Sequence, residues 1–100
     1  MARSRTKLRV HPGEILRYEF LVPLELSART LAGKIGVPAN RLTEIIAERR
    51  GMTADTAIRL GRYFGTSPEF WLNLQTTHDI VKAEADTDYS QVPKGRRAAA

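Results

Sequence analysis

The 100-residue sequence predicts an all-α fold of five helices in a single domain. Apolar residues recur at the three- and four-residue spacing of an amphipathic helix along five stretches. No stretch alternates apolar and polar residues over the length of a strand. Residues that start or stop helices, such as Ser, Thr, Pro and Gly, bound each stretch. An apolar content of 42% is enough for one small core.

The first two helices are predicted from the residues at their ends. The first is expected to span about Pro12 to Leu21, because a proline at a helix start leaves no N–H without a partner. Pro23 is expected to end it. The second is expected to follow Ser27, whose hydroxyl can accept a hydrogen bond from a backbone N–H. Gly36 can adopt the left-handed conformation at its end.

The third and fourth helices occupy the middle of the chain. Pro38 is expected to start the third helix, which would run toward Arg49 or Arg50. Thr53 is expected to cap the fourth helix, which contains Gly61 at a cost of about 1 kcal/mol relative to alanine. Close helix packing would explain this glycine.

The fifth helix and the termini set the expected domain boundaries. Ser67 is the predicted N-cap of this helix, and Pro68 is its predicted first residue. Apolar residues thin out from about residue 85 onward. We therefore expect a domain over residues 11–84, a flexible basic arm over residues 1–10 and a flexible tail over residues 85–100.

The net charge of +5 is unevenly distributed along the chain. The first ten residues carry +4, the last seven carry +3 and residues 27–50 carry +3, whereas residues 69–88 carry −4. This pattern favours a polyanion at one surface and a different partner at another. Ordinary solvated surface charge is the alternative.

Several classes of protein are excluded by composition. The absence of cysteine excludes a disulfide framework and thiolate metal sites, and it fits a cytoplasmic location. No stretch approaches the roughly 20 apolar residues that cross a membrane, and no secretory signal is present. His11 and His78 match no metal motif, and no glycine loop for phosphate occurs. We therefore expect no enzyme activity, cofactor, metal or small-molecule substrate.

Residues 28–45 carry the spacing of a helix-turn-helix. Counting Ala28 as position one, Ala32 lies at position five and Gly36 at position nine. The apolar positions four, eight, ten, fifteen and eighteen are Leu31, Ile35, Val37, Leu42 and Ile45. A small residue lets the two helices cross closely, glycine makes the turn, and the apolar set fixes the crossing. Such a pair can be a plain corner of the core, but the complete pattern favours DNA binding.

The outward positions of the third helix are candidates for contacts with bases. Asn40 can bond adenine through its amide, and Arg41 can take a guanine edge or a phosphate. Glu44 can accept from a cytosine amino group, orient Arg41 or face solvent. For each residue, a solvated surface position is the alternative. The full set of predicted base contacts is Ala39, Asn40, Arg41, Thr43 and Glu44.

A second set of residues is suited to phosphate contacts. It contains a hydroxyl and three guanidinium groups, which lie near the ends of the two helices: Ser27, Arg29, Arg49 and Arg50. The basic arm is either a DNA contact along the backbone or minor groove, or a solubilising terminus. Its charged residues are Arg3, Arg5, Lys7 and Arg9.

Three segments carry a resemblance to a known family: "HPGEILRYEFLVPLELS", "GVPANRLTEI" and "RGMTADTAIRLGRYFGTSPEFWLNLQ". They resemble the HigA-type antitoxins, a branch of the Xre (Cro/cI-like) helix-turn-helix proteins, over roughly residues 11–84. The resemblance implies a compact five-helix domain like that of lambda repressor, which dimerises and binds double-stranded operator DNA. It also implies autorepression and neutralisation of a HigB-type toxin, a ribosome-dependent mRNA-cleaving nuclease. The alternative is a stand-alone Xre-type repressor without a toxin partner.

Two departures from the family pattern concern the DNA surface. Many Xre proteins carry glutamine at the position of Ala28, where it braces a phosphate, and Arg29 is the expected substitute. Many HigA-like chains carry Asn-Gly-Lys where this chain has Ala47-Glu48-Arg49. The sequence therefore leaves the end of the third helix open.

A homodimer is expected to use the fifth helix. Operator recognition by a two-fold dimer needs two recognition helices about 34 Å apart. The surplus apolar surface of this helix is the predicted seam, formed by Phe70, Leu74, His78, Ile80 and Val81. The alternative is that Phe70 and Trp71 serve only the core of their own chain.

Overall fold

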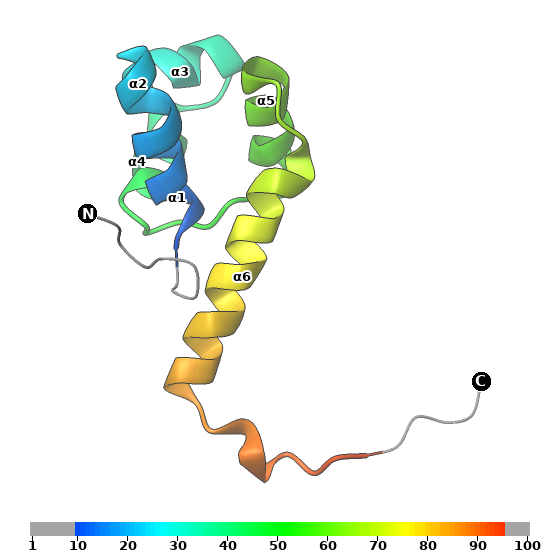
Figure 1. Cartoon of the computed structure of the whole chain (residues 1–100). Coiled ribbons are helices and arrows are strands. Elements are labelled where there is room, and N and C mark those ends of the chain that lie inside the picture. Colours follow the sequence, from blue (N-terminus) through cyan, green and yellow to red (C-terminus); the bar gives the residue numbers. More distant parts are fainter. Residues whose placement is uncertain (1–9, 96–100) are drawn as a thin grey trace, which may run out of the picture.

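The computed structural model describes residues 10–95, and every regular element in that range is helical (Figure 1). This confirms the predicted all-α class. The elements are α1 (Pro12–Ile15), the π-helical segment η1 (Leu16–Leu21), α2 (Val22–Leu24), α3 (Ala28–Ile35), α4 (Ala39–Ile46), α5 (Ala54–Phe64), α6 (Pro68–Asp86) and the 3-10 turn η2 (Tyr89–Gln91). Because α1, η1 and α2 are continuous, they form one helix, and five helices result. Among the helices of residues 10–95, none combines the length and apolar character needed to cross a bilayer.

The first helix continues past Pro23, so the prediction that this proline ends it is wrong. The helix widens into a π-helical turn before the proline, and the N–H of Val22 donates to the carbonyl of Arg17, five residues earlier. A wider turn moves the preceding carbonyls away from the pyrrolidine ring, which an α-helical turn would bring into contact. The helix ends at Glu25, whose φ of 52° is left-handed.

The start of α1 contacts α6 through two histidines. His11 is buried and caps α1, because its Nδ1 accepts a hydrogen bond from the N–H of Gly13 at 2.9 Å. Its ring meets the ring of His78 edge to face at 4.9 Å. Burial, together with the neighbouring His78, lowers the pKa of His11 below its usual value. The cap is therefore maintained by the neutral imidazole.

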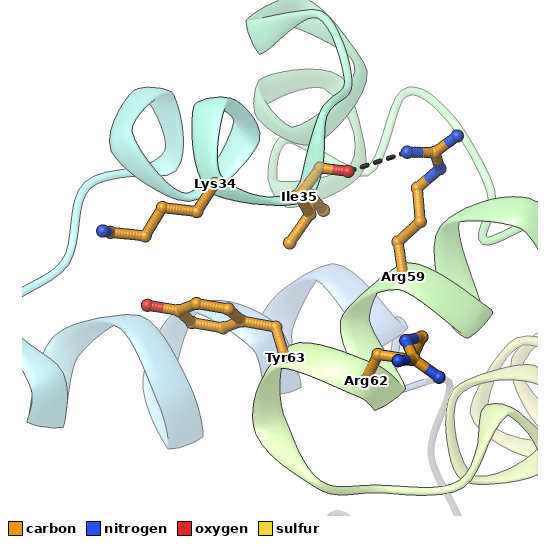
Figure 2. Close-up of a pocket in the computed structure, with 5 residues that line it drawn as sticks. All are labelled: Lys34, Ile35, Arg59, Arg62 and Tyr63. Atoms are coloured by element: carbon orange, nitrogen blue, oxygen red, sulfur yellow. Dashed lines mark hydrogen bonds between the residues drawn. The ribbon is translucent and has the colours of Figure 1, made fainter.

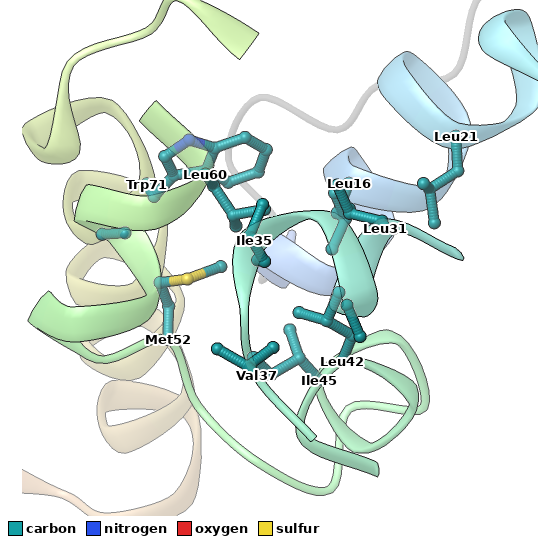
Figure 3. Packing of buried hydrophobic residues seen from close by; sticks show 12 residues of the cluster. Leu16, Leu21, Leu31, Ile35, Val37, Leu42, Ile45, Met52, Leu60 and Trp71 are labelled. Carbon is teal, nitrogen blue, oxygen red and sulfur yellow. The ribbon is translucent and has the colours of Figure 1, made fainter. Parts of the chain in front are cut away.

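The core gathers apolar side chains from every helix of the domain (Figure 3). Trp71 of α6 is wholly buried, and its indole N–H donates to the hydroxyl of Thr66 at 2.8 Å, which satisfies its one polar group. The buried apolar set is Leu16, Leu21, Leu31, Ala32, Ile35, Val37, Leu42, Ile45, Met52, Ala57, Leu60 and Trp71. All of the apolar positions predicted for the helix-turn-helix belong to this set: Leu31, Ile35, Val37, Leu42 and Ile45.

Two glycines mark places where backbones approach closely. A Cβ on Gly61 would lie 2.5 Å from the carbonyl oxygen of Thr66, so the close packing expected at this glycine is present. A Cβ on Gly13 would overlap the carbonyl oxygen of Ile45, which brings the start of α1 directly against α4. Gly33 in α3 differs, since a Cβ there would meet no atom within 4 Å.

The C-terminal part of α6 extends beyond the other helices (Figure 1). The helix runs to Asp86, and Lys82 pairs with Asp86 at 2.9 Å in its last turns. The turn η2 follows, with Asp88 accepting from the N–H of Ser90 at 2.9 Å. The predicted basic arm over residues 1–10 lies outside the described residues except for its last position, as do residues 96–100 of the predicted tail.

Glycine-to-alanine substitutions should separate the two kinds of glycine. Gly61→Ala should lower the free energy of unfolding by about 2 kcal/mol, because the new methyl group strikes a backbone oxygen. Gly33→Ala, the matched control inside α3, should raise it by about 1 kcal/mol, because alanine favours the helix and has room. Urea denaturation of both variants measures the two changes. Equal stabilisation of both would contradict the close approach at Gly61.

Candidate nucleic-acid interface

The helix-turn-helix is formed by α3 and α4, joined through Gly36, Val37 and Pro38. Ser27 caps α3 by accepting from the N–H of Thr30 at 3.0 Å, as its sequence position predicts. Gly36 has a left-handed φ of 78°, which turns the chain at the end of α3. Pro38 is the N-cap of α4. Leu31, Leu42 and Ile45 are wholly buried, so the inner faces of both helices are fixed in the core.

The end of α4 differs from the prediction, because the helix stops at Ile46 and does not reach Arg49. Glu48 adopts a left-handed φ of 63°. The N–H of Glu48 donates to the carbonyl of Ile45 at 3.0 Å, and the N–H of Arg49 donates to the carbonyl of Glu44 at 2.8 Å. This is the Schellman pattern, in which C′ is usually glycine. Glu48 therefore adopts the conformation that glycine would provide in the related Asn-Gly-Lys sequence.

The predicted base contacts are not equivalent in the structure. Asn40 and Thr43 are exposed at the front of α4, and the Thr43 hydroxyl donates to the carbonyl of Asn40 at 3.3 Å. Ala39 is half-buried and packs against the core, so less of its methyl group is available to a base. Asn40 therefore presents the least engaged polar side chain of the set.

The direction of Arg41, which the sequence left open, is set by Asp55 of α5. Nη1 of Arg41 donates to Oδ2 of Asp55 at 2.6 Å, and the same oxygen accepts from Nε of Arg59 at 3.1 Å. Hydrogen bonds from Arg41 and then from Arg59 lower the pKa of the Asp55 carboxyl. Asp55 and Arg59 are not among the residues predicted from the sequence, although their four-residue spacing on one helix is a recognisable ion-pair signal.

Glu44 pairs with Arg50, a partner that the sequence alternatives did not include. Its Oε1 lies 2.7 Å from Nη2 and 2.9 Å from Nε of Arg50. The short α4 makes this possible, because Arg50 lies in the loop after the helix instead of at its end. This ion pair therefore joins Glu44, a predicted base contact, to Arg50, a predicted phosphate contact.

The other predicted phosphate contacts differ in availability. Ser27 uses its hydroxyl within the cap, where it also donates to Oγ1 of Thr30 at 2.9 Å. Arg29 and Arg49 are exposed and form no ion pair with another side chain of residues 10–95. These two arginines therefore present available positive charge at the helix-turn-helix.

A shallow basic pocket of about 340 Å³ lies between α3 and α5 (Figure 2). Figure 2 shows Arg59 on its wall, with Nη1 donating to the carbonyl of Ile35 at 2.8 Å. The pocket is lined by Lys34, Ile35, Arg59, Arg62 and Tyr63. It has no carboxylate, thiol or imidazole in its lining. Across residues 10–95, no group of three or more potential ligands is arranged to hold a metal ion.

The five predicted dimer residues lie on α6 with unequal exposure. Ile80 is 52% exposed and Phe70 is 39% exposed, whereas Leu74, His78 and Val81 are half-buried. Phe70 also packs inside its own chain, with its ring 5.0 Å from Trp71 and 6.3 Å from Phe20. Trp71 serves the core of its own chain, while Phe70 has both an inner and an outer contact surface.

Comparison with known proteins supports the sequence resemblance. No protein-family model matches the chain. The chain is 54% identical over 77 residues to virulence-associated protein I of Dichelobacter nodosus. This match covers 77% of this chain and 71% of that protein. It is 40% identical over 77 residues to antitoxin HigA-1 of Vibrio cholerae, covering 76% and 72% of the two chains.

A solved structure agrees with both the sequence and the fold. The antitoxin HigA of Pseudomonas aeruginosa, determined with the higBA promoter, matches with a TM-score of 0.76 and 49% identity. The match covers 78% of this chain and 85% of that chain. The two chains are therefore similar in both fold and sequence over most of their lengths. The chain therefore belongs to the HigA-type antitoxins, a family of helix-turn-helix regulators.

Proposed function

We propose that the chain binds operator DNA, represses its own operon and neutralises a HigB-type mRNA-cleaving toxin by direct binding. The observation that carries the DNA-binding part is the exposed front of α4, which presents Asn40 and Thr43 while Leu42 and Ile45 fix the opposite face. A helix held in this way can insert its N-terminal end into the major groove. The antitoxin HigA of Pseudomonas aeruginosa, solved with a promoter, supports the same role here.

Charge around α4 supports contact with the DNA backbone. Arg29 in the first turn of α3 and Arg49 just after α4 are exposed, and neither is neutralised by a carboxylate of residues 10–95. Arginine contacts to phosphate fix the orientation of a protein on the duplex without selecting sequence. We therefore assign these two residues to the backbone and Asn40 to a base. Operator binding implies action in the cytoplasm, where bacterial operons are transcribed.

The antitoxin part rests on the family and on the charge of α6. The segment from residue 69 to residue 88 carries −4, and this acidic surface suits a basic, RNA-cleaving partner. The second candidate is a stand-alone repressor, which would use the same α4 without a toxin. We assign no catalytic role, in keeping with the antitoxins HigA-1 and HigA to which the chain is similar.

A homodimer would place two copies of α4 on one operator. Ile80 and Phe70 expose apolar surface on α6, and the C-terminal part of that helix extends beyond the rest of the fold (Figure 1). Burial of such surface against a second copy is favourable at about 25 cal/mol per Å². We therefore propose α6 as the dimer seam, with residues 11–84 as the domain that carries the DNA surface.

Asn40→Ala should weaken the preference of the protein for its own upstream DNA over a scrambled duplex. Loss of a bidentate contact with a base should reduce that preference by about tenfold or more. Gel-shift titration at several salt concentrations measures it, with Gln91→Ala in η2 as a control that also removes an exposed amide. Affinity that does not fall as salt rises would contradict DNA binding through phosphates.

Light scattering should show a dimer at a chain concentration of tens of micromolar. Ile80→Asp should shift the protein toward the monomer. The aspartate would carry a charge into a buried apolar seam, which weakens association. Size-exclusion chromatography with light scattering measures the mass directly. A wild-type protein that remains monomeric at this concentration would contradict the seam on α6.

Co-expression with the neighbouring reading frame should distinguish the two candidate functions. An antitoxin should co-purify with the neighbouring product and restore growth when that product is toxic on its own. The neighbouring product should also cleave mRNA in the absence of this chain. A neighbour that neither binds this chain nor harms the cell would leave the stand-alone repressor as the function.

A further inference from the structure

Asp55 connects three helices of the candidate interface through one carboxylate oxygen. Oδ2 accepts from Nη1 of Arg41 at 2.6 Å and from Nε of Arg59 at 3.1 Å. Arg59 also donates from Nη1 to the carbonyl of Ile35 at 2.8 Å (Figure 2). The network therefore joins the end of α3, the front of α4 and the first turn of α5.

The two arginines on Asp55 differ in how firmly the fold holds them. Arg59 lies one turn from Asp55 on the same helix and has a second partner in α3, so its position is fixed from two directions. Arg41 reaches Asp55 from another helix, and its side chain has no second partner among residues 10–95. Arg41 is therefore the arginine whose other N–H groups are able to turn to an acceptor on DNA.

The contact with Asp55 also fixes which edge of Arg41 faces outward. A guanidinium has five N–H groups, and Asp55 engages Nη1, which leaves Nε and Nη2 for another acceptor. A guanine presents O6 and N7 to such an edge in the major groove. Held in one orientation, the guanidinium loses less freedom when it meets a matching base.

Asp55 has the opposite effect on DNA that offers no matching base. The side chain of Asp55 is 56% exposed, so its carboxylate is accessible beside the α4 surface that is proposed to bind DNA. Phosphate oxygens near this carboxylate are repelled by it, and they compete with it for Arg41. Non-operator DNA therefore gains less from Arg41 than it would from an unpaired arginine.

We infer that Asp55 is a positioning residue that aims Arg41 and weakens binding to non-operator DNA, and so determines the specificity of the α4 surface. The inference rests on the DNA binding proposed above. It assigns Asp55 no contact with a base. The role is electrostatic and orientational, and it is exerted through Arg41.

Asp55→Asn removes the charge and keeps the size of the side chain. Affinity for a scrambled duplex should rise about threefold to tenfold, and the slope of log K against log salt should steepen by about 0.9, as one more phosphate contact forms. The preference for the upstream duplex should fall about tenfold. Fluorescence anisotropy of labelled upstream and scrambled duplexes at several salt concentrations measures all three quantities. Asp55→Glu, which keeps the carboxylate, should retain the preference.

Asp88→Asn is the matched control for charge. It removes the same charge beyond the end of α6, and asparagine can still accept from the N–H of Ser90. Its effect on either duplex should be less than about twofold. Equal effects of Asp55→Asn and Asp88→Asn would overturn the inference, because net charge alone would then explain the change.

A double-mutant cycle tests whether Asp55 acts through Arg41. In an Arg41→Gln background, Asp55→Asn should no longer alter the preference for the upstream duplex. A change as large as in the wild-type background would overturn the inference. A wild-type protein without any preference for the upstream duplex would defeat the proposed function and this inference together. A wild-type preference that Asp55→Asn leaves intact would overturn the inference alone.

Discussion

The close crossing of α3 and α4 is the constraint on which the other features depend. Leu31, Leu42 and Ile45 are wholly buried together in the core (Figure 3). Ala32 is also buried, and its small side chain lets the helices approach. Because these residues fill the inner face of α4, only the opposite face is left for a ligand. The same packing that stabilises the domain therefore selects which side chains can meet DNA.

The candidate interface combines attraction with restraint. Arg41 and Arg50 are each held by a carboxylate, while Arg29 and Arg49 pair with none in residues 10–95. A surface with every arginine unpaired would bind any duplex strongly, because non-specific affinity follows the number of phosphates that are neutralised. Pairing two of the arginines lowers that general attraction and leaves the choice of sequence to directed contacts.

Local rules predicted the helix starts and most of the core, because the causes act within a few residues. Ser27 and Ser67 cap their helices through the N–H three residues later, as their positions indicate. Glu25 and Glu48 end helices in a left-handed conformation that glutamate does not favour, so no local rule identifies them.

The ion pairs of the site were predictable only in part. Asp55 and Arg59 are four residues apart on one helix, whereas Arg41 lies fourteen residues from Asp55 and reaches it through the fold. The contact between Glu44 and Arg50 depends on α4 stopping at Ile46, which follows from the conformation of Glu48.

Gly13 has a consequence for the genetics of repression. The backbone at this residue lies against the carbonyl of Ile45, so a side chain there would displace α4 from the far side of the domain. A screen for loss of repression would then recover changes at Gly13 beside those in residues that touch the operator. The melting temperature of each recovered variant would separate changes that destabilise the domain from changes that remove a DNA contact. A DNA-binding surface defined only by such a screen would wrongly include Gly13, which is buried against α4.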